Sequence, residues 1–116
     1  MPPLPRFSCS PAYYKTLFHE ITHSTGHESR LNRPGITLPM EQRVPRSEPH
    51  AHEELIAELG AIYLCQHAGI SQQPLQENAA AYIDSYLGYL KNDKRFLFQA
   101  SSQAQKAVNF LLEAPT

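Results

Sequence analysis

The distribution of proline constrains most strongly what this chain of 116 residues can fold into. Eight of the ten prolines lie at or before Pro49, and only Pro74 and Pro115 follow. Because proline lacks an amide donor and fixes its backbone φ angle, the first half is predicted to be rich in loops and the second half to be helical. Alternation of apolar and polar residues is nearly absent, so we expect little or no sheet. The length fits one small domain over residues 1–116.

Four helices are predicted from apolar spacing and from residues typical of helix ends. The first begins at Ser10, where a hydroxyl can cap the helix before Pro11, and ends near Thr25 because Gly26 follows. The other three are expected at about 49–67, 74–91 and 93–113. The expected fold class is therefore mainly α, with a core of about four helices.

The connection over residues 28–47 carries four arginines, which are Arg30, Arg33, Arg43 and Arg46. Arginines in a loop can contact phosphates, but here glutamates are interleaved with them and no aromatic residue is available for stacking on bases. We therefore interpret this segment as a solvated loop.

Charge and cysteine content exclude several classes of protein. Ten basic and eleven acidic residues give a net charge of -1, which argues against a nucleic-acid module that binds by charge alone. No apolar run is long enough to span a membrane, and no signal peptide is recognised, so no membrane partner is expected. Cys9 and Cys65 are too few for a disulfide scaffold, and this favours the cytoplasm.

A histidine motif, His19-Glu20-Ile21-Thr22-His23, lies in the first predicted helix. Residues four apart lie one turn apart on the same helical face, so His19 and His23 can converge on one metal ion. Glu20 follows at about 100° around the helix axis, where it can hold a water molecule without binding the metal. The alternative is that both histidines belong to the solvated face of an ordinary amphipathic helix.

Two glutamates in the second predicted helix, Glu54 and Glu58, share the same four-residue spacing. The ridge that they begin continues with Ala61, Ile62 and Cys65. Carboxylates directed toward a buried face are costly unless they meet a metal or a donor. A zinc site with two histidines commonly takes a carboxylate as its third ligand and keeps a fourth position for water. The alternative is a capping or surface pair of glutamates.

The motifs of both helices together resemble zincin metallopeptidases in which the first Glu of Glu-x-x-Ala-Glu binds zinc. The closer resemblance is to the C-terminal metallopeptidase domain of the antirestriction protein ArdC, which also occurs in plasmid and phage polyvalent proteins. The matching stretches are residues 13–27, 30–33, 53–61, 91–95 and 104–107. They follow the order of the family and are spread along nearly the whole chain.

The resemblance implies a role for each matching residue. His19, His23 and Glu54 would bind Zn²⁺ or another divalent metal, and Glu20 would be the general base. Glu58 would hold one histidine in its tautomer and orientation. No other cofactor is implied.

The position of His27 is less well defined by the resemblance. In the related His-Glu-x-x-His-x-x-Gly-x-x-His class a third histidine binds the metal. Gly26 fits that pattern, but Ser29 stands at the position of the third histidine. His27 is therefore expected to be an accessory residue that lines the cleft.

The implied function is hydrolysis of peptide bonds by a zinc-dependent metallopeptidase-like domain acting on a protein or peptide substrate. The alternative is a non-catalytic, metal-stabilised interaction module of an antirestriction protein. The family's preceding strands and its single-stranded-DNA-binding domain have no counterpart here, so we expect DNA contact only through that absent domain. The resemblance also implies a bacterial protein of a mobile element, in the cytoplasm. It leaves the oligomeric state open.

Other histidines and tyrosines carry weaker predictions. His50 and His52 are either accessory donors near Glu54 or surface residues. The regularly spaced tyrosines of the third helix, Tyr82, Tyr86 and Tyr89, are interpreted as core or interface residues. Tyr13 and Tyr63 are instead the candidates for a hydroxyl that reaches the cleft.

Overall fold

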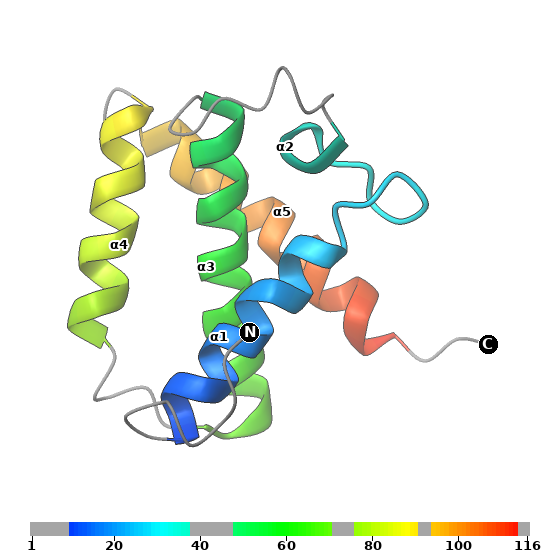
Figure 1. Ribbon diagram of the computed structural model, residues 1–116, viewed down its shortest axis with the longest axis vertical. Helices are drawn as coiled ribbons and strands as arrows, with labels where there is room; N and C mark the ends of the chain where they lie inside the picture. Colours follow the sequence, from blue (N-terminus) through cyan, green and yellow to red (C-terminus); the bar gives the residue numbers. More distant parts are fainter. Residues whose placement is uncertain (1–9, 38–47, 71–75, 91–93, 114–116) are drawn as a thin grey trace.

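The fold is built from helices, as a computed structural model shows for residues 10–37, 48–70, 76–90 and 94–113 (Figure 1). The helices are α1 (Ser10–Ser24), α2 (Pro34–Thr37), α3 (Glu48–Ala68), α4 (Gln76–Tyr89) and α5 (Lys94–Leu112). These ranges contain no strand, and none of their helices has the length and apolar character needed to cross a membrane. The mainly α prediction is confirmed. The four long helices lie within about two residues of their predicted bounds, whereas α2 was not predicted.

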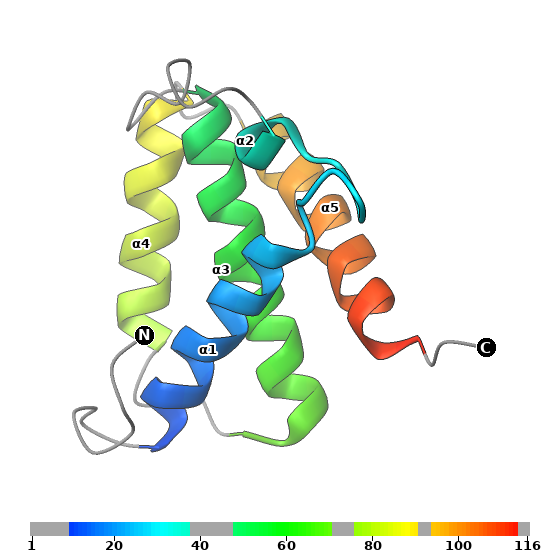
Figure 2. The same cartoon turned by 45° about the vertical axis from the view of Figure 1, so that its right-hand side comes forward.

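Helix α3 is the central element, and α1, α4 and α5 all pack against it (Figures 1 and 2). Its apolar residues are not confined to one face, as is typical of a helix surrounded by others. The fully or almost fully buried core residues that form one cluster are Ala51, Leu55, Ile56, Leu90, Ala100 and Ala104. Since α1 crosses α3, polar residues on the side of α3 that meets α1 lie inside the molecule.

The crossing of α1 and α3 is close because of a glycine. A Cβ atom at Gly60 would lie 2.5 Å from Cγ2 and 2.7 Å from Oγ1 of Thr22. Thr22 is fully buried, and its hydroxyl donates to the carbonyl of Phe18 at 2.8 Å. Gly60 therefore lets the two helices approach, which brings the acidic residues of α3 against the histidines of α1.

After α1 the chain reverses and returns over the end of that helix. The amide of Leu31 donates to the carbonyl of Thr25 at 2.9 Å, and the amide of Arg33 donates to the carbonyl of Gly26 at 3.0 Å. Asn32 between them has a φ of 50°, a left-handed conformation that asparagine tolerates better than most residues. This return places Arg33 inside the molecule.

The interpretation of residues 28–47 as a solvated loop is wrong for Arg33, which is only 4% exposed. Its guanidinium is buried because a carboxylate of α3 faces it, as described below. Arg30 is exposed, as predicted. Arg43 and Arg46 lie outside the described residues.

Candidate metal centre

His19, His23 and Glu54 converge on one point between α1 and α3. Nε2 of His19 lies 3.1 Å from Nε2 of His23 and 3.1 Å from Oε2 of Glu54. Nε2 of His23 lies 3.4 Å from Oε1 of Glu54. These side chains form a group of possible metal ligands, and it contains the three residues that the sequence predicted as ligands.

The spacing of these atoms fits a tetrahedral zinc ion. With metal–ligand bonds of about 2.0–2.1 Å, two ligand atoms of a tetrahedral site lie about 3.4 Å apart. The three separations of 3.1, 3.1 and 3.4 Å are close to that value, with the two distances to Glu54 ending on different oxygens of its carboxylate. Two imidazoles and one carboxylate are also the donor set of many zinc sites that keep a position for water. The residues present therefore fit a zinc ion.

The other ring nitrogen of each histidine meets a carboxylate of α3. Nδ1 of His23 donates to Oε2 of Glu53 at 2.8 Å, and Nδ1 of His19 lies 3.4 Å from Oε2 of Glu58. A proton held on Nδ1 leaves the lone pair of Nε2 free for a metal. Both imidazoles are thus oriented with Nε2 toward the shared point.

The carboxylates around His19 and His23 favour the protonated, positively charged forms of both imidazoles. Burial by itself lowers the pKa of His23, but hydrogen bonds to Glu53 and Glu54 outweigh burial and raise that pKa to about 9. The pKa of His19 is also raised, because hydrogen bonds to Glu54 and Glu58 outweigh its burial and the repulsion of His23. Burial would raise the pKa of Glu54, yet its hydrogen bonds to both histidines and to Tyr82 lower it well below the usual range. A bound cation would replace the protons that this cluster otherwise holds.

Tyr82 reaches the centre from α4. Its hydroxyl donates to Oε2 of Glu54 at 2.6 Å, and its ring meets the His19 ring edge-on. Burial and the Glu54 carboxylate raise the pKa of Tyr82, so the phenol stays protonated and remains a donor. The interpretation of Tyr82 as a core or interface residue did not include this contact with Glu54. The hydroxyl of Tyr63 instead bonds to Ser101 at 2.7 Å.

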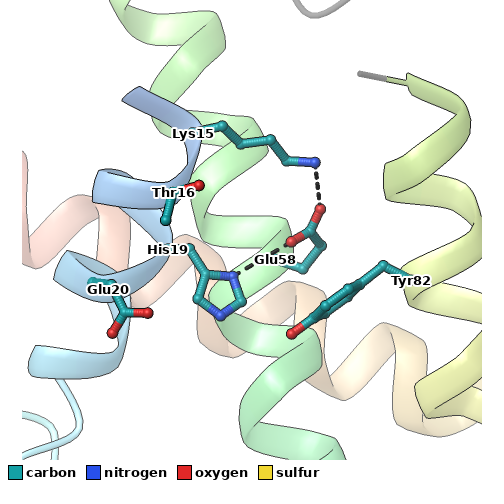
Figure 3. A pocket seen from close by; sticks show the side chains of 6 residues that line it. All are labelled: Lys15, Thr16, His19, Glu20, Glu58 and Tyr82. Carbon is teal, nitrogen blue, oxygen red and sulfur yellow. Dashed lines mark ion pairs between the residues drawn. The ribbon is translucent and has the colours of Figure 1, made fainter. Parts of the chain in front are cut away.

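A pocket of about 300 Å³ opens beside His19 (Figure 3). Six residues from α1, α3 and α4 line it, and these are Lys15, Thr16, His19, Glu20, Glu58 and Tyr82. Glu20 is exposed and does not belong to the group of three possible ligands. Its carboxylate is therefore available to a molecule in the pocket.

Three other predicted histidines do not belong to the group of three possible ligands. His27 is exposed, and its Nδ1 lies 2.8 Å from Oγ of Ser29. The ring of His50 packs near Tyr86, and the ring of His52 packs near Phe96. The two pockets that His27 lines do not include His19 or Glu20. The ring contacts of His50 and His52 do not involve His19 or Glu20 either.

Sequence reasoning missed two residues of the centre, Glu53 and Arg33. Helical spacing singled out Glu54 and Glu58 because they share one ridge, and Glu53 lies outside that ridge. Arg33 is remote in sequence and was grouped with neighbouring loop arginines. Both residues belong to the stretches that match the ArdC-type domain, which is the one signal that could have found them.

Comparison with known proteins identifies the family of the chain. The family model of zincin-like metallopeptidases matches residues 1–103. Two Escherichia coli proteins, both named DNA primase TraC, are 37% and 35% identical over 112 residues, which make up 97% of this chain but only 10% and 7% of theirs. The uncharacterized protein y4eC of Sinorhizobium fredii (strain NBRC 101917 / NGR234) is 32% identical over 111 residues, which make up 93% of this chain and 34% of that protein.

The chain thus spans about a third or less of the curated relatives it matches. No solved structure matches it. The match of the family model over most of the chain, together with the resemblance carried by the motifs of α1 and α3, shows that the chain belongs to the zincin-like metallopeptidase family.

Proposed function

We propose that this chain is a zinc-dependent metallopeptidase domain that hydrolyses peptide bonds. The observation that carries the proposal is the convergence of His19, His23 and Glu54 within 4.8 Å of one another, beside a pocket lined by Glu20. His19, His23 and Glu54 would hold the ion. A protein or peptide segment would occupy the pocket.

A bound zinc ion supplies Lewis acidity, which polarises the scissile carbonyl and makes a water molecule more acidic. Glu20 then acts as the general base. It takes a proton from the attacking water and passes it to the leaving amine nitrogen. This role is supported by the position of Glu20, which lines the pocket and is not one of the three possible ligands.

Tyr82 and Glu58 hold the surrounding groups in place. The protonated hydroxyl of Tyr82 donates to Glu54 and so fixes the carboxylate that would bind the metal. Glu58 lies between Nδ1 of His19 and Nζ of Lys15, 3.4 Å from the first and 2.5 Å from the second. We assign both residues to positioning of the ligands.

The test is replacement of Glu20 by Gln in the zinc-loaded chain, with cleavage of a quenched fluorescent peptide library as the assay. Loss of a general base should lower hydrolysis by about 10²–10⁴-fold, with zinc content unchanged. Glu28→Gln is the matched control, because Glu28 is also an exposed acid but lines a different pocket. Unchanged hydrolysis in Glu20→Gln would overturn the assignment. Full zinc occupancy with no hydrolysis by the parent chain would instead support the non-catalytic, metal-stabilised module.

An antirestriction role, which the resemblance to ArdC implies, is proposed as the cellular use of this chemistry. Expression of the chain should raise transformation of a restricting host by unmodified plasmid, and Glu20→Gln should abolish the gain. Equal protection by Glu20→Gln would mean that binding alone protects. No protection by the parent chain would overturn the role.

A further inference from the structure

Arg33 is a buried arginine, and each of its three guanidinium nitrogens donates to a buried residue. Its Nε and Nη2 donate to the two oxygens of Glu53, at 2.8 and 3.1 Å. Nη1 donates to the hydroxyl of Thr25 at 2.7 Å, and Nη2 also donates to the carbonyl of Thr22 at 2.8 Å. Such a bidentate pair of hydrogen bonds fixes the plane of the carboxylate as well as its position.

Glu53 passes this constraint to a metal ligand. Its Oε2 accepts from Nη2 of Arg33 and also from Nδ1 of His23, at 2.8 Å. The side chains of Arg33 and Glu53 are only 4% and 5% exposed, so water does not compete for these bonds. The orientation of the His23 ring, and with it the direction of Nε2, therefore depends on a residue outside α1 and α3.

The chain reversal after α1 is shaped to accept this arginine. A Cβ atom at Gly26 would lie 3.0 Å from Nη2 of Arg33 and 2.5 Å from Cγ1 of Ile36. The amide of Arg33 donates to the carbonyl of Gly26 at 3.0 Å. Glycine at position 26 thus leaves room for the guanidinium against the end of α1.

We propose that Arg33 and Glu53 are positioning residues of the metal centre, which fix His23 for metal binding through an Arg33–Glu53–His23 chain of hydrogen bonds. The inference rests on the proposed zinc centre. Arg33 lies in the segment between α1 and α2, so this segment also determines metal affinity.

The experiment measures zinc affinity by competition with a chromophoric chelator and records the visible spectrum of the Co²⁺-loaded chain. Glu53→Gln keeps the shape of the side chain but removes its charge, and Arg33→Lys keeps the charge but removes the bidentate pair of hydrogen bonds. Each should weaken zinc binding by about 10–100-fold and change the Co²⁺ absorption bands. Because both residues act through one chain of hydrogen bonds, the double variant should bind zinc little more weakly than the weaker-binding single variant.

A control separates positioning from stability. Leu90→Ala removes a buried core side chain that belongs to the apolar cluster and not to the centre, so it should lower the melting temperature with zinc affinity and Co²⁺ spectrum unchanged. If the parent chain binds zinc but Glu53→Gln and Arg33→Lys bind it equally well, the inference is wrong and the centre stands. If the parent chain binds no zinc, the proposed function itself fails.

Discussion

The two histidines of the centre are supported in different ways. On one side, His23 contacts Glu53 at 2.8 Å, and Glu53 is gripped by Arg33 inside the fold. On the other side, His19 contacts Glu58 at the longer distance of 3.4 Å, and Glu58 is paired with Lys15. Each support consists of a carboxylate from α3 and a basic residue, but only the second lines the pocket.

This difference indicates that the two supports have different roles. Arg33 donates to Glu53, to Thr25 and to the backbone of Thr22, so the support of His23 is tied to the chain reversal after α1. The support of His19 borders the pocket, where a substrate can contact it. We therefore expect the fold to depend on the first support and the binding of substrate to depend more on the second.

The largest expected effect follows from removal of Arg33. Arg33→Ala removes the guanidinium that bonds to both oxygens of Glu53 and leaves this buried carboxylate with the bond from His23. Breaking a buried pair in this way costs about 3–5 kcal/mol of unfolding free energy. Lys15→Ala should cost less than this, because Lys15 is more exposed, at 13%, and pairs at the edge of a pocket. Urea denaturation of the metal-free chain measures both.

A double variant controls for this comparison. Replacing Arg33 and Glu53 together by Met removes both buried charges and should recover most of the stability lost in Arg33→Ala. Equal losses for Lys15→Ala and Arg33→Ala would contradict the division between the two supports.

A smaller loss of stability is expected from a change at Gly60, because both supports depend on the close crossing of α1 and α3. Gly60→Ala places a methyl group against Thr22 at the crossing of α1 and α3, and overpacking of this kind costs about 1–3 kcal/mol. Because the shift separates the helices that carry both supports, zinc affinity should fall as well. Thermal and urea denaturation with zinc titration check this.

Gly88→Ala in α4 is the matched control, because a Cβ atom there meets nothing within 4 Å. This substitution should leave zinc affinity unchanged and stabilise the chain by up to about 1 kcal/mol. A Gly60→Ala variant that behaves like Gly88→Ala would show that the close crossing has no role.

The smallest effect concerns Glu54, which lies between the two supports. Tyr82→Phe removes one hydrogen bond to its carboxylate and should lower the unfolding free energy by about 0.5–1.5 kcal/mol, with weaker zinc binding. Tyr63→Phe removes a similar hydroxyl bond to Ser101 away from the centre. It should cost a similar amount of stability without changing zinc affinity, and equal zinc affinities in the two variants would argue against a role for Tyr82.

The shared face of the two histidines and the long helices could be predicted because local rules govern them. Four-residue spacing places His19 above His23 on one helical face whatever the rest of the fold does. Apolar periodicity and the glycines and prolines at helix ends predicted α1, α3, α4 and α5 to within about two residues. These features depend on residues close together in the sequence.

Apart from Glu58, which the resemblance implied, the partners of the ligands could not be predicted from spacing, because they depend on how distant segments pack. Arg33 and Tyr82 lie 20 and 28 residues from the glutamates that they contact, and no spacing rule connects such positions. Regular spacing of tyrosines predicted a packed face of α4 but could not show that one hydroxyl would meet Glu54. The short helix α2 was hidden by Pro34, which is typical of loops but also suits the first position of a helix.

The central claim is that His19, His23 and Glu54 hold one zinc ion. It is tested most directly by anomalous scattering at the zinc edge from crystals of the zinc-loaded chain. We expect a single peak about 2.0–2.2 Å from Nε2 of His19, Nε2 of His23 and a carboxylate oxygen of Glu54. No peak at that point, or a zinc ion bound only by other residues, would contradict it.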